Sequence, residues 1–225
     1  MLPGHPLGPG FLFTYPKTDR MKRLLLLITL FVPLAASGQV VNYAKTLPER
    51  AFSIGLAPSY FFDNGSVGLR SLGIQPDENG SLAVGLSGGY GIQYSLDLAV
   101  KYMYVMNGTD YFGVDLQYLI HEARNSYFSV IAGLHRWDGY GVDLTGLFTY
   151  SLRYSLNFSA GLDLDVDYYT DYNESGDSKV AARFWLPVNV GLNAGEMLFI
   201  FAEYDLPVSE LSWGILALGV NIVIR

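Results

Sequence analysis

Apolar positions alternate with small, polar or charged positions along ten short segments of the chain. Between Ser95 and Tyr102, for example, the even-numbered residues are apolar and the odd-numbered residues are small or polar, apart from a single lysine. Successive side chains of a β-strand point to opposite faces, so a period of two separates two environments. We therefore predict ten amphipathic strands, with the even-numbered positions forming the apolar face of every one.

The boundaries of these strands follow from the turn residues between them. Asn107-Gly108 and Asp138-Gly139 have the composition of tight hairpin turns, which need positive φ angles. The ten predicted strands are 51–62, 81–91, 94–106, 109–120, 127–137, 141–150, 156–168, 179–192, 198–208 and 211–224.

These strands point to a membrane-spanning barrel. Downstream of residue 40, no apolar run approaches the roughly 20 residues that a membrane helix needs. A bilayer accepts amphipathic strands only as a closed barrel, because hydrocarbon cannot hydrogen-bond an open sheet edge. We predict an all-β fold, an antiparallel up-and-down transmembrane β-barrel of ten strands, with eight strands as the main alternative.

A soluble sandwich or lipocalin-like barrel also alternates, but it turns its apolar face inward. The odd-numbered positions here are mostly Gly, Ala, Ser and Asp rather than the Lys, Glu and Thr of a solvated sheet. Small residues suit a crowded lumen, so the composition of the odd face favours the membrane barrel.

The amino terminus carries an export signal. Lys22 and Arg23 precede an apolar run from Leu24 to Ala36, and a small-x-small cleavage pattern follows. We expect residues 1–20 to be an over-extended start, with a cytoplasmic extension as the alternative, and 21–38 to be a signal peptide. Residues 39–50 would form a periplasmic lead-in, and residues 51–225 the barrel.

Charge and cysteine content narrow the classes of function. Residues 1–38 hold four of the 14 basic residues and one of the 21 acidic ones, which leaves about ten negative charges on the remaining chain. A surface of this charge disfavours nucleic acid as a partner. The chain has no cysteine, which excludes disulfides and thiolate chemistry.

Aromatic residues at even-numbered positions are expected near both edges of the apolar band, as girdles at the membrane interfaces. The outer girdle would comprise Tyr60, Tyr104, Phe112, Tyr168 and Tyr204. The inner girdle would comprise Tyr90, Tyr94, Tyr118, Phe128, Tyr150 and Phe158.

With its export signal, ten amphipathic strands, aromatic girdles and a last strand that runs through Leu218–Arg225, the chain resembles small bacterial outer-membrane β-barrel proteins of the outer-membrane protein A-like kind. The resemblance covers residues 39–225. It implies location in the bacterial outer membrane, contact with lipid and lipopolysaccharide, and insertion by the barrel-assembly machinery. Many such proteins end in an aromatic residue, whereas this chain ends in Arg225.

The odd-numbered face carries the candidate functional residues. Its expected lumen-lining acids are Asp97, Asp115, Asp143, Asp163, Asp165, Asp167, Glu203 and Asp205. Lys101 and Arg183 are the basic residues expected among them. Because a buried carboxylate is costly unless it is paired or hydrogen-bonded, we expect salt-bridge networks around these two cations.

The acidic lumen permits two functions. Salt-bridged acids would form a polar plug, and the protein would then act as a structural barrel or bind an extracellular partner through loops 63–80 and 170–178. Unpaired acids would instead line a narrow porin-like path that favours cations. Ten strands enclose little more space than eight, which favours the plug.

Enzymatic and metal-binding functions have less support. His135 would face the lumen beside Trp137, but no serine is placed to act as its nucleophile, so we predict no catalytic residue and an interior hydrogen-bonding role for His135. A hydrolase acting on lipid or peptide remains the enzymatic alternative.

Asp163, Asp165, Asp167, Asp171 and Glu174 follow the spacing of a calcium loop, which makes the last four candidate ligands. The position that requires glycine is Tyr168, and the strand period already accounts for the first acids. We therefore predict no metal site and no cofactor.

Overall fold

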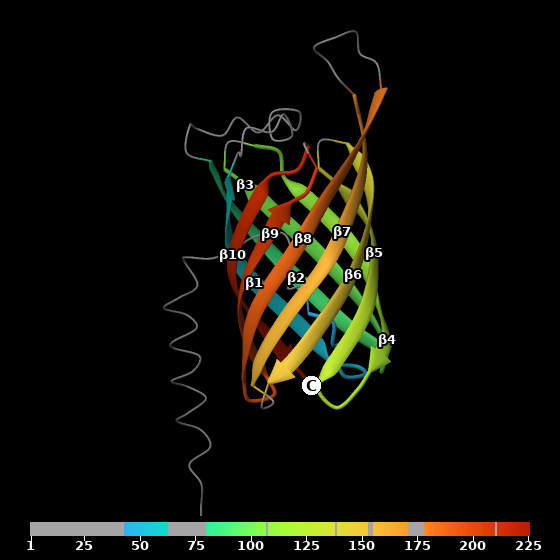
Figure 1. Ribbon diagram of the computed structural model, residues 1–225, viewed down its shortest axis with the longest axis vertical. Helices are drawn as coiled ribbons and strands as arrows, with labels where there is room; N and C mark the ends of the chain where they lie inside the picture. Colours follow the sequence, from blue (N-terminus) through green and yellow to red (C-terminus); the bar gives the residue numbers. More distant parts are fainter. Residues whose placement is uncertain are drawn as a thin grey trace, which may run out of the picture. The chain divides into compact units, whose positions relative to one another are not determined.

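The computed structural model describes residues 43–62, 80–106, 108–137, 139–152, 155–170, 178–209 and 211–225. Ten β-strands in these ranges form one sheet (Figure 1). They are β1 (Phe52–Phe62), β2 (Ser81–Gln93), β3 (Leu96–Val105), β4 (Tyr111–Glu122), β5 (Ser126–Arg136), β6 (Tyr140–Leu152), β7 (Leu156–Thr170), β8 (Ser178–Ala194), β9 (Leu198–Pro207) and β10 (Gly214–Ile224). Within the same ranges, no helix is long and apolar enough to cross a membrane.

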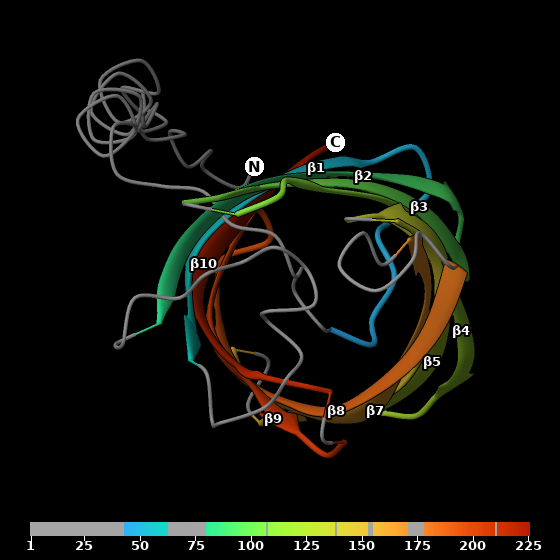
Figure 2. The same cartoon turned by 90° about the horizontal axis from the view of Figure 1, so that it is seen from above.

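The sheet closes into a barrel. Each strand pairs antiparallel with its neighbours in sequence, and β1 pairs with β10, so that Phe52 lies opposite Ile224 and Phe62 opposite Gly214. Viewed from above, the strands form a continuous ring (Figure 2). The prediction of ten antiparallel up-and-down strands is confirmed, and the eight-stranded alternative is wrong.

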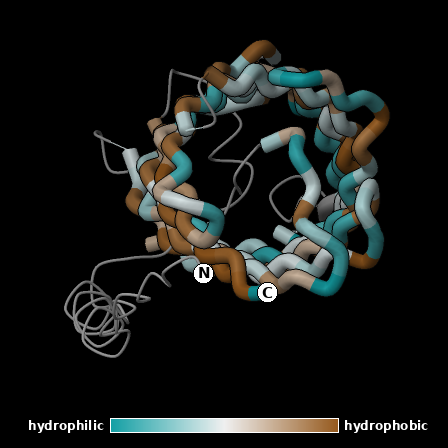
Figure 3. The backbone as a smooth tube through the Cα atoms, turned by 90° about the horizontal axis from the view of Figure 1, so that it is seen from below, coloured by the Kyte–Doolittle hydropathy of each residue, from teal (hydrophilic) through white to brown (hydrophobic). Residues whose placement is uncertain are grey.

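The two faces of the wall have the predicted parity. Even-numbered apolar side chains point outward, as at Leu134, which is 66% exposed, while odd-numbered Leu147 is fully buried in the lumen. Hydrophobic and hydrophilic residues alternate along the strands around the ring (Figure 3). A soluble sandwich or lipocalin-like barrel would have the opposite orientation.

The last strand begins later than the sequence pattern predicts. We expected it from residue 211, but β10 starts at Gly214. The Ser212 hydroxyl instead accepts a hydrogen bond from the backbone N–H of Phe184 at 3.0 Å and donates one to the carbonyl of Phe184 at 2.7 Å. These bonds occupy the backbone edge of β8 beyond the end of β9, so Trp213 turns into the lumen.

The end of β4 also lies beyond its predicted position at residue 120. His121, expected in a turn, lies in β4 and pairs with Phe128 of β5. A register shift between Leu119 and His121 lets the strand continue to Glu122.

The two ends of the barrel differ in the chain segments that they carry. We call the end where β1 begins and β10 ends the terminal end. The turns at residues 94–95, 123–125 and 195–197 lie at this end. We call the opposite end, where β1 ends and β10 begins, the loop end.

Candidate functional site

Strand register brings four charged residues into one lateral row of the lumen wall. Asp115 of β4 lies opposite Gly133 of β5, which lies opposite Asp143 of β6. Asp143 in turn lies opposite Asp165 of β7, and Asp165 opposite Arg183 of β8. We call Asp115, Asp143 and Asp165 the carboxylate row.

The next row towards the loop end has a similar composition. Lys101 lies opposite Gly113, Gly113 opposite His135, His135 opposite Gly141, and Gly141 opposite Asp167. A glycine thus separates each pair of charged side chains, which leaves room for them to approach each other across the missing side chain.

The two fixed cations of the lumen each contact a carboxylate. The Lys101 ammonium contacts Asp115 Oδ2, and Arg183 Nη1 contacts Asp167 Oδ2. All four side chains are almost completely buried. Breaking such a pair by removing one partner leaves the other charge buried and uncompensated, which costs about 3–5 kcal/mol.

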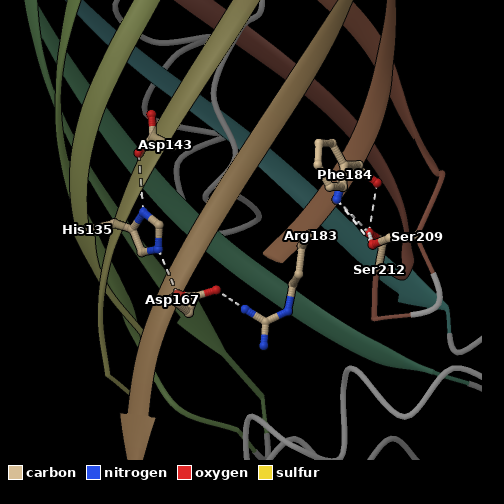
Figure 4. Close-up of polar contacts among 7 residues, drawn as sticks. All are labelled: His135, Asp143, Asp167, Arg183, Phe184, Ser209 and Ser212. Atoms are coloured by element: carbon tan, nitrogen blue, oxygen red, sulfur yellow. Dashed lines mark hydrogen bonds and ion pairs between the residues drawn. The ribbon is translucent and has the colours of Figure 1, made fainter. Parts of the chain in front are cut away.

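His135 joins two acids from neighbouring strands. Its Nε2 lies 2.8 Å from Asp167 Oδ1, and its Nδ1 lies 3.2 Å from Asp143 Oδ2 (Figure 4). Arg183 contacts the other oxygen of Asp167. These four residues therefore form one chain of polar contacts across the neighbouring strands β5, β6, β7 and β8. Tyr111 stacks on the imidazole, with ring centroids 5.5 Å apart.

The remaining acids of the lumen have separate surroundings. Asp163 accepts a hydrogen bond from the Thr145 hydroxyl at 2.6 Å, and Glu203 accepts one from the Asn189 amide at 3.0 Å. Asp205 is only 2% exposed, and neither of its carboxylate oxygens has a hydrogen-bond partner within the described ranges.

The loop end of the lumen is filled by a hydrophobic cluster that sequence analysis did not predict. We call it the loop-end cluster, and it consists of Phe61, Ala83, Met103, Val105, Tyr111, Trp137, Trp185, Trp213 and Ile215. Trp213 lies at its centre, with edge-to-face contacts to Trp137 at 5.2 Å and Trp185 at 5.4 Å between ring centroids. The Arg183 guanidinium lies 5.3 Å from the centroid of Trp213, which joins the cluster to the charged rows.

The terminal end is partly filled by chain that precedes β1. We call residues 43–47 the luminal segment; they run inside the ring of strands (Figure 2). Ala44 is fully buried, and its N–H donates to Thr149 Oγ1 at 2.9 Å while its carbonyl accepts from the Ser129 hydroxyl. The Tyr43 ring stacks on Phe199, with centroids 5.0 Å apart.

Further polar contacts hold both ends of the luminal segment. The Gln117 amide donates to the carbonyl of Tyr43 at 2.9 Å. The N–H of Leu47 donates to Asp97 Oδ2 at 2.6 Å. Burial raises the pKa of the Tyr43 phenol, because the phenolate would lose its hydration.

A cavity of about 340 Å³ remains beside the luminal segment. It extends from Glu196 and Arg225 at the terminal rim to Asp97, Lys101 and Asp115 in the lumen. The charged rows can therefore be approached from the terminal end of the barrel.

The structure places all eight predicted lumen acids on the inward face and buries most of them almost completely. Among the candidate metal ligands, Asp165 and Asp167 lie in the lumen, whereas Asp171 and Glu174 fall outside the described residues. Most of the two predicted binding loops, residues 63–79 and 171–177, also falls outside them. The luminal segment and the inward aromatic residues were missed, although the odd-numbered aromatic residues near the strand ends were a visible signal.

Comparison with known proteins leaves the fold as the common feature. No family model matches the chain, and no curated protein matches it. Among solved structures, it is similar to the N-terminal β-barrel domain of Pseudomonas aeruginosa OprF, with 11% identity, coverage of 79% of this chain and 100% of that one, and a TM-score of 0.37. It is also similar to the NanC porin, with 14% identity, coverage of 75% and 98%, and a TM-score of 0.47.

A third similar structure is the Acinetobacter baumannii outer membrane protein Omp33, with 10% identity, coverage of 79% and 99%, and a TM-score of 0.37. These neighbours are bacterial outer-membrane barrels and porins.

Proposed function

We propose that the protein is a bacterial outer-membrane barrel with a closed lumen, and that its role is structural or mediated by its loops. The observation that carries this proposal is the filling of both ends of the lumen. The loop-end cluster fills one end and the luminal segment the other, with buried ion pairs between them.

The outward face supports location in a membrane. Its exposed side chains are predominantly apolar, and Leu116, at the middle of β4, is 47% exposed. The sheet has no free edge, which is the condition for spanning hydrocarbon with strands. Lipid, lipopolysaccharide and the barrel-assembly machinery are the partners that follow from this location.

Substitution of Leu116 by Arg tests the location. In a bilayer the charge on the lipid face is expected to destabilise the barrel by about 2–4 kcal/mol, measured by urea unfolding in lipid vesicles. On the surface of a water-soluble barrel the same change would stay within about 0.5 kcal/mol. A small effect, or recovery of the folded protein in the soluble periplasmic fraction, would contradict the proposal.

Conductance in planar bilayers tests the closed lumen. We expect the full chain to be silent, and we expect measurable conductance after deletion of residues 43–47 is combined with Trp213→Ala, because both seals are then removed. Glu196→Gln, at the exposed rim, serves as the matched control and should remain silent. Steady conductance of the unmodified protein would overturn the proposal.

A cation-favouring path is the second candidate function. The specific observation in its favour is the excess of carboxylates over Lys101 and Arg183 on the inward face, together with the cavity that reaches them from the terminal end. If the unmodified protein conducts and its reversal potential in a salt gradient shows cation preference, this candidate replaces the closed barrel.

A further inference from the structure

The centre of the carboxylate row is a glycine over which two acids converge. A methyl group at Gly133 would lie 2.4 Å from Asp115 Oδ1 and 2.4 Å from Asp143 Oδ2. Both carboxylates therefore occupy the space directly above this glycine, where like charges repel each other unless a proton or a cation lies between them.

A third carboxylate belongs to the same group. Asp143, Asp165 and His135 each offer a potential ligand atom, and these atoms all lie within 4.8 Å of one another. Asp165 is almost completely buried, and its cross-strand neighbour is Asp143. Asp143 thus belongs to both groups: it lies above Gly133 together with Asp115, and it offers a ligand atom within 4.8 Å of those of Asp165 and His135.

One buried carboxylate oxygen at this place has no hydrogen-bond donor within the described part of the chain. Asp115 is 2% exposed, and its Oδ1, the atom above Gly133, accepts no hydrogen bond from any residue that the structure describes. The Lys101 ammonium contacts the other oxygen of Asp115, Oδ2. An acceptor buried in this way loses its hydration without compensation, so a group that supplies positive charge there would stabilise the fold.

The local charge balance indicates the valence of that group. The two charged rows hold four carboxylates and two fixed cations, namely Asp115, Asp143, Asp165 and Asp167 against Lys101 and Arg183. Two negative charges remain, which is the charge that one divalent cation neutralises. His135 Nδ1 lies 3.2 Å from Asp143 Oδ2, and the other oxygen of Asp143, Oδ1, also lies at the space above Gly133, 2.5 Å from the position of the added methyl group.

We propose that the carboxylate row binds one hard divalent cation, of the Ca²⁺ type, above Gly133. Carboxylate oxygens are the ligands that Ca²⁺ prefers, and it accepts several of them in irregular geometries. The cavity from the terminal rim to Asp115 provides the access path. The site differs from the calcium-loop spacing in the sequence, because strand register and not loop order brings its ligands together.

Calcium titration of the complete protein tests the proposal. The full chain is folded into detergent micelles, stripped with EDTA and titrated with CaCl₂ by calorimetry. We expect one ion per barrel, and we expect saturating Ca²⁺ to raise Tm by several degrees because only the folded barrel holds the site.

Three variants locate the ion. Asp143→Asn removes a ligand, and Gly133→Ala fills the space above the glycine while it keeps every carboxylate; each should weaken Ca²⁺ binding at least tenfold. Asp110→Asn is the matched control, because Asp110 is an exposed acid that accepts a hydrogen bond from Tyr102 outside the lumen. Its affinity for Ca²⁺ should equal that of the unmodified protein. Heat-modifiable gel mobility verifies that each variant has folded.

Three results would overturn the proposal. The first is absence of binding by the unmodified protein at 5 mM Ca²⁺, which needs no variant to interpret. The second is equal affinity in the Asp143→Asn and Asp110→Asn variants. The third is preference for Zn²⁺ that His135→Gln abolishes, since the cation would then be bound through imidazole nitrogen. None of these results depends on whether the lumen conducts.

Discussion

The loop end of the lumen is filled by side chains of the barrel wall, whereas the terminal end is filled by a separate segment of chain. At the loop end, Trp213 and its neighbours contact each other through apolar surface, so the seal is part of the strands themselves. At the terminal end, the luminal segment is held by hydrogen bonds to Ser129, Thr149 and Asp97, and by packing of Ala44 and Tyr43 against the lumen wall. The first seal should therefore fail only with the whole barrel, while the second can loosen alone.

The largest effect is expected from Trp213→Ala. Removal of a fully buried aromatic ring from the loop-end cluster should destabilise the barrel by about 3–5 kcal/mol, measured by urea unfolding in lipid vesicles. Trp213→Phe is the control, since it keeps a ring and loses no hydrogen bond to the residues that the structure describes. Equal losses in the two variants would mean that ring packing is not what seals this end.

Gly141→Ala should destabilise the barrel by disturbing the charged rows that lie between the two ends of the lumen. A methyl group there would lie 2.1 Å from His135 Nε2 and 2.8 Å from Asp167 Oδ1, so it would separate that hydrogen-bonded pair. We expect a loss of about 1–3 kcal/mol in the same measurement. Gly146→Ala on the same strand is the matched control, because its methyl group would meet nothing within 4 Å, and an equal loss there would contradict the explanation.

A smaller and local effect is expected from Thr149→Val. The change removes the acceptor of the Ala44 N–H, together with the hydrogen bond between the Thr149 and Ser159 hydroxyls, and should weaken the attachment of the luminal segment by about 1 kcal/mol. Hydrogen exchange of the luminal segment should accelerate, while exchange in the strands and the unfolding midpoint stay nearly constant. If the strands exchange faster to the same extent, the two ends of the lumen are not independent.

The smallest effect is expected from Glu196→Gln. Its carboxylate pairs with Arg225 at 2.5 Å, but the two side chains are 78% and 55% exposed, and water and salt screen the pair. The unfolding free energy should change by less than about 0.5 kcal/mol. A larger loss would show that the carboxyl end of β10 contributes to closure at the terminal end.

Most of what the sequence predicts about this fold comes from its period of two. Parity alone assigns an outward or inward direction to residues such as Leu116 and Asp115, and it is correct in all ten strands because the lipid and the lumen are distinct environments. Position along the barrel axis has no such signal. The sequence pattern therefore places Trp185 in the strand 179–192 but does not predict its contact with Trp213. That contact depends on strand register and on the inward turn after β9.

The candidate site is harder to predict for the same reason. Parity places Asp115 and Asp143 on the inward face, but only the pairing of β4, β5 and β6 aligns them with Gly133 in one row. The luminal segment was also beyond reach, because residues 43–47 have no period and their contacts are specified by the lumen wall that surrounds them. Periodic elements are predictable from their own residues, whereas these contacts depend on the complete barrel.

The loop-end cluster also has a spectroscopic consequence. The chain has three tryptophans, Trp137, Trp185 and Trp213, and all of them belong to this cluster with nearly perpendicular rings. Indole chromophores at centroid distances of 5.2 and 5.4 Å couple electronically, so their fluorescence emission and exciton signal in circular dichroism report on one place only. Tryptophan fluorescence of the unmodified protein therefore reports on the loop end. It does not report on the terminal end, because all three tryptophans belong to the loop-end cluster.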